Sequence, residues 1–142
     1  MPILDTEVIF AFNPKDKHHK HALDLLREIK SGKLRNIVIP DTAILEFITV
    51  LKAKGVTIEG ILLLLNALKT IMKEYSIKET KTLGIETLTL ALHFMKKGAS
   101  FFDALLAASA KIIDNTIISD DTIYDHLGVQ RIPFGEERKT NA

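Results

Sequence analysis

The stretch Ile37-Val38-Ile39-Pro40-Asp41-Thr42-Ala43 decides the fold class, because a short apolar run leads at once into a helix start. The three β-branched residues at its beginning, bounded by a proline, predict a brief buried strand. The pair Asp41-Thr42 is a typical N-cap, so a helix is expected over residues 43–54, and Gly55 ends it. A strand that passes directly into a helix is the repeating unit of α/β proteins.

The same alternation continues on both sides of this stretch. Short β-rich runs predict further strands at residues 3–4, 117–118 and 129–132, and a weakly marked one at 75–77. Apolar residues at helical spacing predict helices over residues 18–30, 58–70, 83–97 and 101–112. Strands that alternate with helices form parallel βαβ units. We therefore expect a three-layer α/β/α domain with a mainly parallel central sheet over residues 1–134, followed by a polar tail over residues 135–142.

The composition is that of an ordinary globular domain. The 142 residues are 46% hydrophobic and 26% charged, with a formal net charge of +1. This balance argues against an acidic disordered tail and against a strongly basic nucleic-acid coat protein. The absence of cysteine excludes disulfides, thiolate zinc sites and a cysteine nucleophile, and it fits a reducing compartment.

No targeting or membrane segment is visible in this sequence. Asp5 and Glu7 interrupt the first ten residues, and no basic stretch precedes an apolar one. The most apolar run, Ile61–Leu65, is far shorter than the ~20 residues that a membrane helix needs. We expect a soluble, cytoplasmic protein that does not contact a membrane.

Acidic residues follow two of the predicted strands. Asp5 comes directly after Ile3-Leu4, and Ser119-Asp120-Asp121 comes directly after Ile117-Ile118. In open parallel sheets, ligands bind beyond the carboxyl ends of the strands. The alternative in both cases is a helix cap or a turn, because Asp also serves that purpose.

Two further acids lie in apolar stretches of predicted helices. Glu46 is flanked by apolar residues on both sides, and a carboxylate is seldom buried unless it is paired or binds a metal. The alternative is a Glu at the edge of the apolar face or one paired with a lysine. Asp103 lies in an apolar, alanine-rich helix, but Ser100 and Asp103 also fit a capping box.

If these four acids converge, their like charges require either raised pKa values or a bound cation. Oxygen ligands without cysteine favour Mg²⁺ or Mn²⁺ over zinc. A magnesium ion held by carboxylates keeps waters and binds phosphate oxygens, which is the chemistry of phosphodiester hydrolysis.

The order and spacing of these motifs resemble the PIN domain family from Ile3 to Pro133. The matching segments are Ile3-Leu4-Asp5-Thr6, Glu46 in its apolar helix, Phe102-Asp103-Ala104-Leu105-Leu106, Ser119-Asp120-Asp121 and Leu127-Gly128-Val129-Gln130-Arg131-Ile132-Pro133. Small chains of this kind most resemble VapC-type toxin ribonucleases. The resemblance implies an Mg²⁺- or Mn²⁺-dependent endoribonuclease that acts on RNA and is held inactive by a small antitoxin protein.

The same resemblance assigns roles to individual residues. Asp5 and Asp103 match the most direct metal ligands, and Glu46 and Asp121 match positions that hold a second metal, a water or the other ligands. Ser119 matches the small hydroxyl residue before the fourth acid, and either Asp120 or Asp121 could face the site. Position 7 holds a glutamate, whereas a small or amide residue is common there in the family. The side chain of Glu7 therefore either points away from the site or adds a negative charge to it.

Two alternatives to the toxin ribonuclease stay open. The chain could be a nuclease of the same class that acts in RNA processing, or, in a different class, a degenerate PIN-like module that binds RNA or a protein without cutting. The presence of all four acids disfavours the module.

Two surface features have both a structural and a functional interpretation. The segment Lys15–His21 is basic and histidine-rich, which is typical of a solvated helix start. Alternatively, it could hold RNA phosphates through Lys15, Lys17 and Lys20. His18 and His21 could also bind a transition metal weakly. Residues 62–65 are apolar on all sides of a predicted helix, which indicates core packing or, alternatively, a homodimer or partner surface.

Overall fold

Five short strands form one parallel sheet in the computed structural model, which describes residues 1–135. The strands are β1 (Ile3–Leu4), β2 (Val38–Pro40), β3 (Lys78–Thr80), β4 (Thr116–Ile118) and β5 (Gln130–Ile132). Their order across the sheet is β3-β2-β1-β4-β5, and every neighbouring pair is parallel. The predicted parallel sheet is therefore confirmed, with the first strand at its centre.

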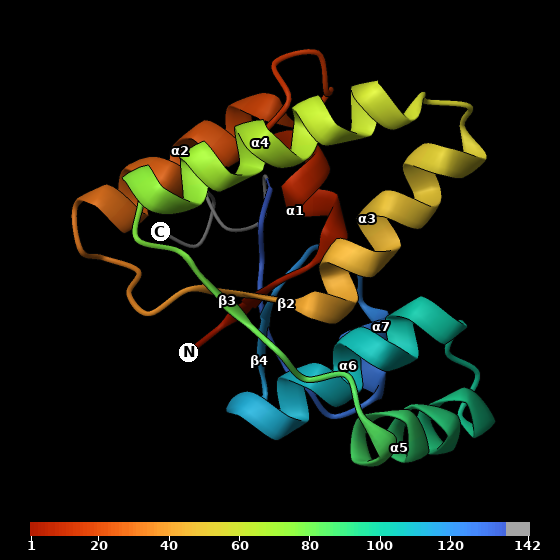
Figure 1. The fold of residues 1–142 in the computed structure, drawn as a ribbon. Helices are drawn as coiled ribbons and strands as arrows, with labels where there is room; N and C mark the ends of the chain where they lie inside the picture. Colours follow the sequence, from red (N-terminus) through yellow and green to blue (C-terminus); the bar gives the residue numbers. More distant parts are fainter. Residues whose placement is uncertain (136–142) are drawn as a thin grey trace.

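The helices between the strands cover the sheet on both sides. They are α1 (Thr6–Ala11), α2 (His19–Lys30), α3 (Asp41–Ala53), α4 (Ile58–Glu74), α5 (Ile85–Lys96), α6 (Phe101–Ile113) and α7 (Ile123–His126). In the view of Figure 1, α2 and α4 lie above the sheet, and α5 and α6 lie below it. The chain proceeds from β1 through β2 to β3 and then returns to the other side of β1 to form β4 and β5. Parallel crossovers are generally right-handed, so this reversal places the later helices on the opposite face of the sheet. The α/β/α layering is confirmed.

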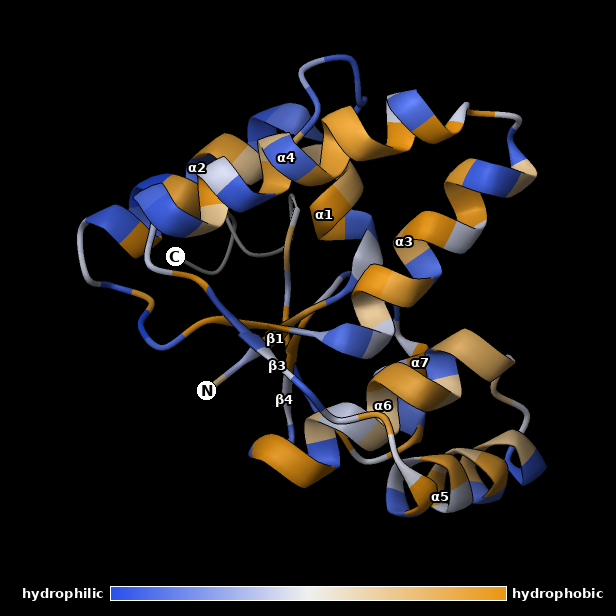
Figure 2. Ribbon diagram, viewed as in Figure 1, coloured by the Kyte–Doolittle hydropathy of each residue, from blue (hydrophilic) through white to orange (hydrophobic). Residues whose placement is uncertain are grey.

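The central strands form the core of the molecule. Ile3, Leu4, Ile117 and Ile118 are completely buried, as expected for parallel strands covered on both faces. Figure 2 shows that β1 and β4 are hydrophobic while the edge strand β3 is largely hydrophilic. Helix α6 is buried along most of its length because its alanines allow close packing against α5 and the sheet.

Two expectations about local structure need correction, and one helix lies where none was expected. The weak strand at residues 75–77 is wrong: the strand lies at Lys78–Thr80, where an exposed edge position requires no apolar run. Asp41 does not cap its own helix; its Oδ1 accepts hydrogen bonds from the backbone N–H and the hydroxyl of Thr82, at 2.9 and 3.0 Å. Helix α1, only six residues long, was not expected.

The apolar segment 62–65 divides between core and surface. Leu64 and Leu65 pack against the core, whereas Leu62 and Leu63 are exposed. Core packing therefore accounts for only half of the segment. Within residues 1–135, no helix combines the length and the apolar character needed to cross a bilayer. Apart from Gly135, the expected polar tail lies outside the described residues.

Candidate active site

An acidic pocket of about 240 Å³ lies where the chain leaves the carboxyl ends of β1 and β4. The residues that line it come from α1, α3, α6 and the loop after β4: Asp5, Thr6, Glu7, Phe10, Glu46, Val50, Asp103 and Asp121. Five of these are carboxylates. No basic side chain is among the described residues that line the pocket. The structure thus brings the four acids of the sequence motifs together and adds Glu7 to them.

Asp5 occupies the junction between β1 and α1. Its Oδ1 accepts the backbone N–H of Thr6 at 2.7 Å, and its Oδ2 accepts the hydroxyl of Ser119 at 2.6 Å. Asp5 is therefore both the N-cap of α1 and a wall of the pocket. Burial raises the pKa of Asp5 to about 7, although the hydrogen bond from Ser119 opposes the rise.

Glu46 and Asp103 reach the pocket from two helices. Both side chains are half-buried, and burial raises the pKa of each carboxyl above its usual range. The charge of Asp103 raises the pKa of Glu46 further, as the charge of Asp121 does for Asp103. Ser100 accepts the backbone N–H of Asp103 at 3.3 Å, so the predicted helix cap is confirmed. Mutual repulsion among these acids marks the pocket as a site that favours a proton or a cation.

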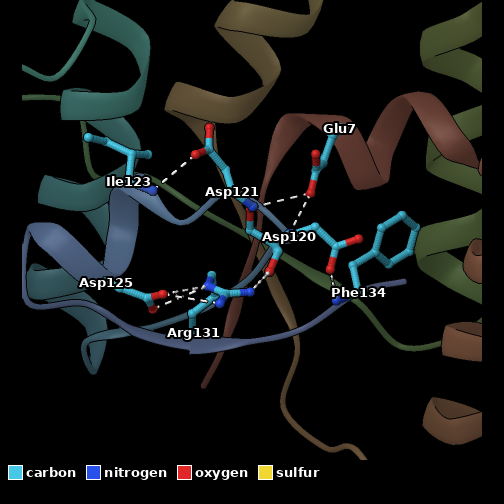
Figure 3. Close-up of polar contacts among 8 residues, drawn as sticks. Glu7, Asp120, Asp121, Ile123, Asp125, Arg131 and Phe134 are labelled. Atoms are coloured by element: carbon cyan, nitrogen blue, oxygen red, sulfur yellow. Dashed lines mark hydrogen bonds and ion pairs between the residues drawn. The ribbon is translucent and has the colours of Figure 1, made fainter. Parts of the chain in front are cut away.

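The side chains of the adjacent residues Asp120 and Asp121 point in different directions, that of Asp120 toward Phe134 (Figure 3). The Asp120 carboxylate accepts the backbone N–H groups of Phe134 and Gly135 at 2.7 and 3.0 Å. Asp121 lines the pocket, and its Oδ1 accepts the backbone N–H of Ile123 at 3.0 Å. The structure therefore places Asp121 at the pocket, while Asp120 holds the chain that follows β5.

Ser119 and Arg131 order the loop between β4 and α7. The Ser119 side chain is completely buried, and its Oγ accepts the backbone N–H of Asp121 at 2.9 Å while donating to Asp5. Arg131, on β5, donates to the carbonyl oxygen of Ser119 at 3.2 Å and pairs with Asp125 at 3.1 Å. The loop thus holds Asp121 and Asp5 in a fixed relation.

Glu7 does not point away from the site. Its Oε1 accepts the backbone N–H of Asp120 at 2.7 Å and lies 3.3 Å from the hydroxyl of Ser119 (Figure 3). Glu7 thereby links α1 to the loop after β4 and also raises the pKa of Asp5 through its charge. Of the two possibilities left open by the sequence, the added charge is the one that the structure supports.

Tyr124 is the residue at this site that sequence reasoning missed. It lies in α7, is completely buried, and donates its hydroxyl to Oδ1 of Asp5 at 3.3 Å. The available signal in the sequence was a tyrosine at an apolar position of a short helix, three residues after Asp121. Buried tyrosine hydroxyls usually have a hydrogen-bond partner.

The donor set of the pocket fits a hard divalent cation. It offers carboxylate and hydroxyl oxygens in an anionic cavity, which are the ligands that Mg²⁺ and Mn²⁺ prefer. Within residues 1–135, no group of three or more His, Asp or Glu side chains is arranged so that it could hold a metal ion. Mg²⁺ commonly takes one or two carboxylates and keeps several waters, so a complete protein cage is not required.

The basic segment Lys15–His21 lies apart from the residues that line the pocket. Lys15, Lys17 and His18 are exposed, as expected for a solvated segment. His21 is instead buried, and its ring packs edge-on against Phe134, with the two centroids 6.0 Å apart. The rings of His18 and His21 stack at 5.9 Å, and no metal-holding group of three includes them among the described residues.

Comparison with known proteins assigns the fold to a family. The model of the PIN domain family matches residues 3–130, so this chain belongs to the PIN domain family. PIN domains are generally nucleases, and they typically use divalent metal ions.

One solved structure of similar fold is that of FitAcB from Neisseria gonorrhoeae. The TM-score is 0.65 and the sequence identity is 17%, over 92% of this chain and 96% of that chain. At this identity the likeness concerns the fold alone. No curated protein matches this sequence closely enough to count as a relative.

Proposed function

We propose that this protein is a metal-dependent endoribonuclease that hydrolyses RNA phosphodiester bonds with the help of Mg²⁺ or Mn²⁺ held by carboxylates. The observation that carries the proposal is the single pocket in which Asp5, Glu46, Asp103 and Asp121 meet Glu7 without a basic neighbour in the lining. Membership of the PIN family supports nuclease activity, and the resemblance of the motifs to VapC-type ribonucleases supports RNA as the substrate.

We assign the residues of the pocket two roles: some hold the cation, and others orient its ligands. Asp5 and Asp103 are the proposed direct ligands, and Glu46 and Asp121 are proposed to hold waters or a second ion. Ser119 orients Asp5 through its 2.6 Å hydrogen bond. A divalent ion bound here would supply a water of lowered pKa and stabilise negative charge on the phosphate. A carboxylate with a raised pKa, such as Glu46, is suited to accept the proton of the attacking water.

We further propose that the protein is the toxin of a toxin–antitoxin pair, with a small antitoxin protein and a second copy of the chain as partners. Exposed apolar side chains support protein partners, because large apolar patches on a surface mark interaction sites. They lie on α4, at Ile58, Leu62 and Leu63, and on α5, at Ile85, Leu88, Leu92 and Met95. Light scattering that shows a monomer at high concentration would contradict the dimer.

The nuclease proposal is tested with purified protein and a labelled RNA in Mg²⁺, in Mn²⁺ and in EDTA. We expect cleavage with either metal and none in EDTA. Asp5→Asn and Asp103→Asn should abolish cleavage while the circular dichroism spectrum is retained, because each removes a charge and no bulk. Glu59→Gln, an exposed acid at the start of α4, is the matched control and should cleave like the wild type.

Two results would overturn the proposal. Full activity of both Asp variants would show that the pocket is not the active site. RNA binding without cleavage under every metal condition would favour the non-cleaving module. An antitoxin-like reading frame beside the gene would favour the toxin over an enzyme of RNA processing.

A further inference from the structure

One buried hydroxyl group contacts a carboxylate of the acidic pocket. Tyr124 has no exposed surface, and its hydroxyl donates to Oδ1 of Asp5 at 3.3 Å. Burial raises the pKa of Tyr124 far above its ordinary value, and the charges of the pocket acids raise it further.

A tyrosine hydroxyl carries one proton, so it donates to one carboxylate at a time. The structure gives that proton to Asp5, at the junction of β1 and α1, and it comes from helix α7, which packs against α6.

We propose that Tyr124 is a positioning residue that holds the carboxylate of Asp5 in the orientation needed to bind a divalent cation. This inference rests on the proposed function. Asp5 has three donors: the N–H of Thr6 and the hydroxyl of Tyr124 on Oδ1, and the hydroxyl of Ser119 on Oδ2. Each comes from a different element, so together they fix the plane of the carboxylate while lone pairs remain for a cation.

Packing alone does not account for a tyrosine at this position. A phenylalanine would fill the same space without placing a polar atom in the core, where a polar group without a partner is costly. Groups that orient metal ligands contribute strongly to metal affinity, and their loss typically weakens it about 10–100-fold.

The test is Tyr124→Phe, which removes one oxygen atom and keeps the ring. Mn²⁺ binding to the whole protein is measured by calorimetry, together with thermal stability in EDTA and RNA cleavage. We expect Mn²⁺ affinity to fall about 10–100-fold, with a parallel loss of activity at limiting metal. Tyr75→Phe is the matched control: it removes the other tyrosine hydroxyl, on a ring that lies under the ammonium group of Lys30 outside the pocket, and should bind Mn²⁺ like the wild type.

The possible outcomes separate this inference from the proposed function. Wild-type Mn²⁺ affinity in Tyr124→Phe, with or without a change in thermal stability, would overturn the positioning role and leave the nuclease proposal standing. A wild-type protein that neither binds Mn²⁺ nor cleaves RNA would overturn both.

If Tyr124→Phe does not fold, fluorotyrosine incorporated into the unaltered chain provides the second measurement. The Tyr75→Phe variant assigns the two fluorine signals. We expect Mg²⁺ to shift the Tyr124 signal and to leave the Tyr75 signal in place. An unchanged Tyr124 signal in a protein that binds Mg²⁺ would overturn the inference.

Discussion

The hydroxyl of Ser119 donates to Oδ2 of Asp5 at 2.6 Å and so joins the ends of the two central strands β4 and β1. Both side chains are buried, Asp5 being 7% exposed and Ser119 not at all. A short hydrogen bond to a buried carboxylate favours its charged form, which is the form that binds a cation.

Ser119→Ala should therefore raise the pKa of Asp5 above its value of about 7 and weaken catalysis. We expect about a 10–100-fold loss of metal-dependent cleavage near neutral pH and a pH–rate profile displaced toward higher pH. Ser109→Ala is the control, since Ser109 is equally buried but bonds to Thr42 and Thr82 outside the pocket. It should lower thermal stability and leave the pH profile in place. An unshifted profile in Ser119→Ala would contradict the role assigned to this hydrogen bond.

The metal-free protein should lose stability as the pH rises from about 4 to about 7. In this interval the folded protein keeps a proton on Asp5, whose pKa is about 7, while the unfolded chain has lost it, with a pKa of 3.8. The free energy of unfolding then falls with pH by up to about 1.4 kcal/mol per unit from this group. The raised pKa values of Glu46 and Asp103 act in the same direction.

Denaturant unfolding in EDTA at several pH values measures this slope. Asp5→Asn cannot ionise and should show a smaller slope than the wild type. Mn²⁺ should stabilise the protein more at pH ~7.5 than at pH ~5, because protons compete with the ion at lower pH. Stability that stays constant or rises between pH ~4 and ~7 would contradict a buried, proton-retaining Asp5.

Glu7 should contribute both charge and structure, and two substitutions separate these contributions. Glu7→Gln keeps an oxygen to accept the backbone N–H of Asp120 and removes one of five negative charges from the pocket. We expect it to retain its thermal stability and to bind Mn²⁺ several-fold more weakly. Glu7→Ala should also lose stability, by about 1 kcal/mol for the missing hydrogen bonds. Equal Mn²⁺ affinity in Glu7→Gln and wild type would leave Glu7 with a structural role only.

The neighbours Asp120 and Asp121 should respond in opposite ways to substitution. Asp121→Asn should lower Mn²⁺ affinity and RNA cleavage with little change in stability, because its carboxylate lines the pocket. Asp120→Ala should lower stability by about 1 kcal/mol or more, because Phe134 and Gly135 lose the acceptor of their N–H groups, while Mn²⁺ affinity is retained. Calorimetric binding and thermal unfolding of both variants provide the comparison. A loss of Mn²⁺ affinity in Asp120→Ala alone would reverse the assignment.

The local pattern of residues predicted the fold class but not every element. Runs such as Ile37–Ile39 and Ile117-Ile118 are apolar without alternation, which is typical of strands covered on both faces in a parallel sheet. The edge strand β3 was not predicted, because a strand at the exposed edge of a sheet needs no apolar residues. Helix α1 was missed because six residues carry little periodicity.

The sequence by itself also determined which acids follow strands and which lie in apolar helices, because strand ends and helix faces are local properties. Only the tertiary structure decided how these acids meet. It turns Asp121 toward the pocket, engages Asp120 with the chain after β5, brings Glu7 to the pocket, and joins Tyr124 to Asp5. The contacts of Glu7 with Asp120 and of Asp5 with Ser119 and Tyr124 join residues more than 100 positions apart, so they depend on the packing of the elements around the carboxyl ends of β1 and β4 and not on local spacing.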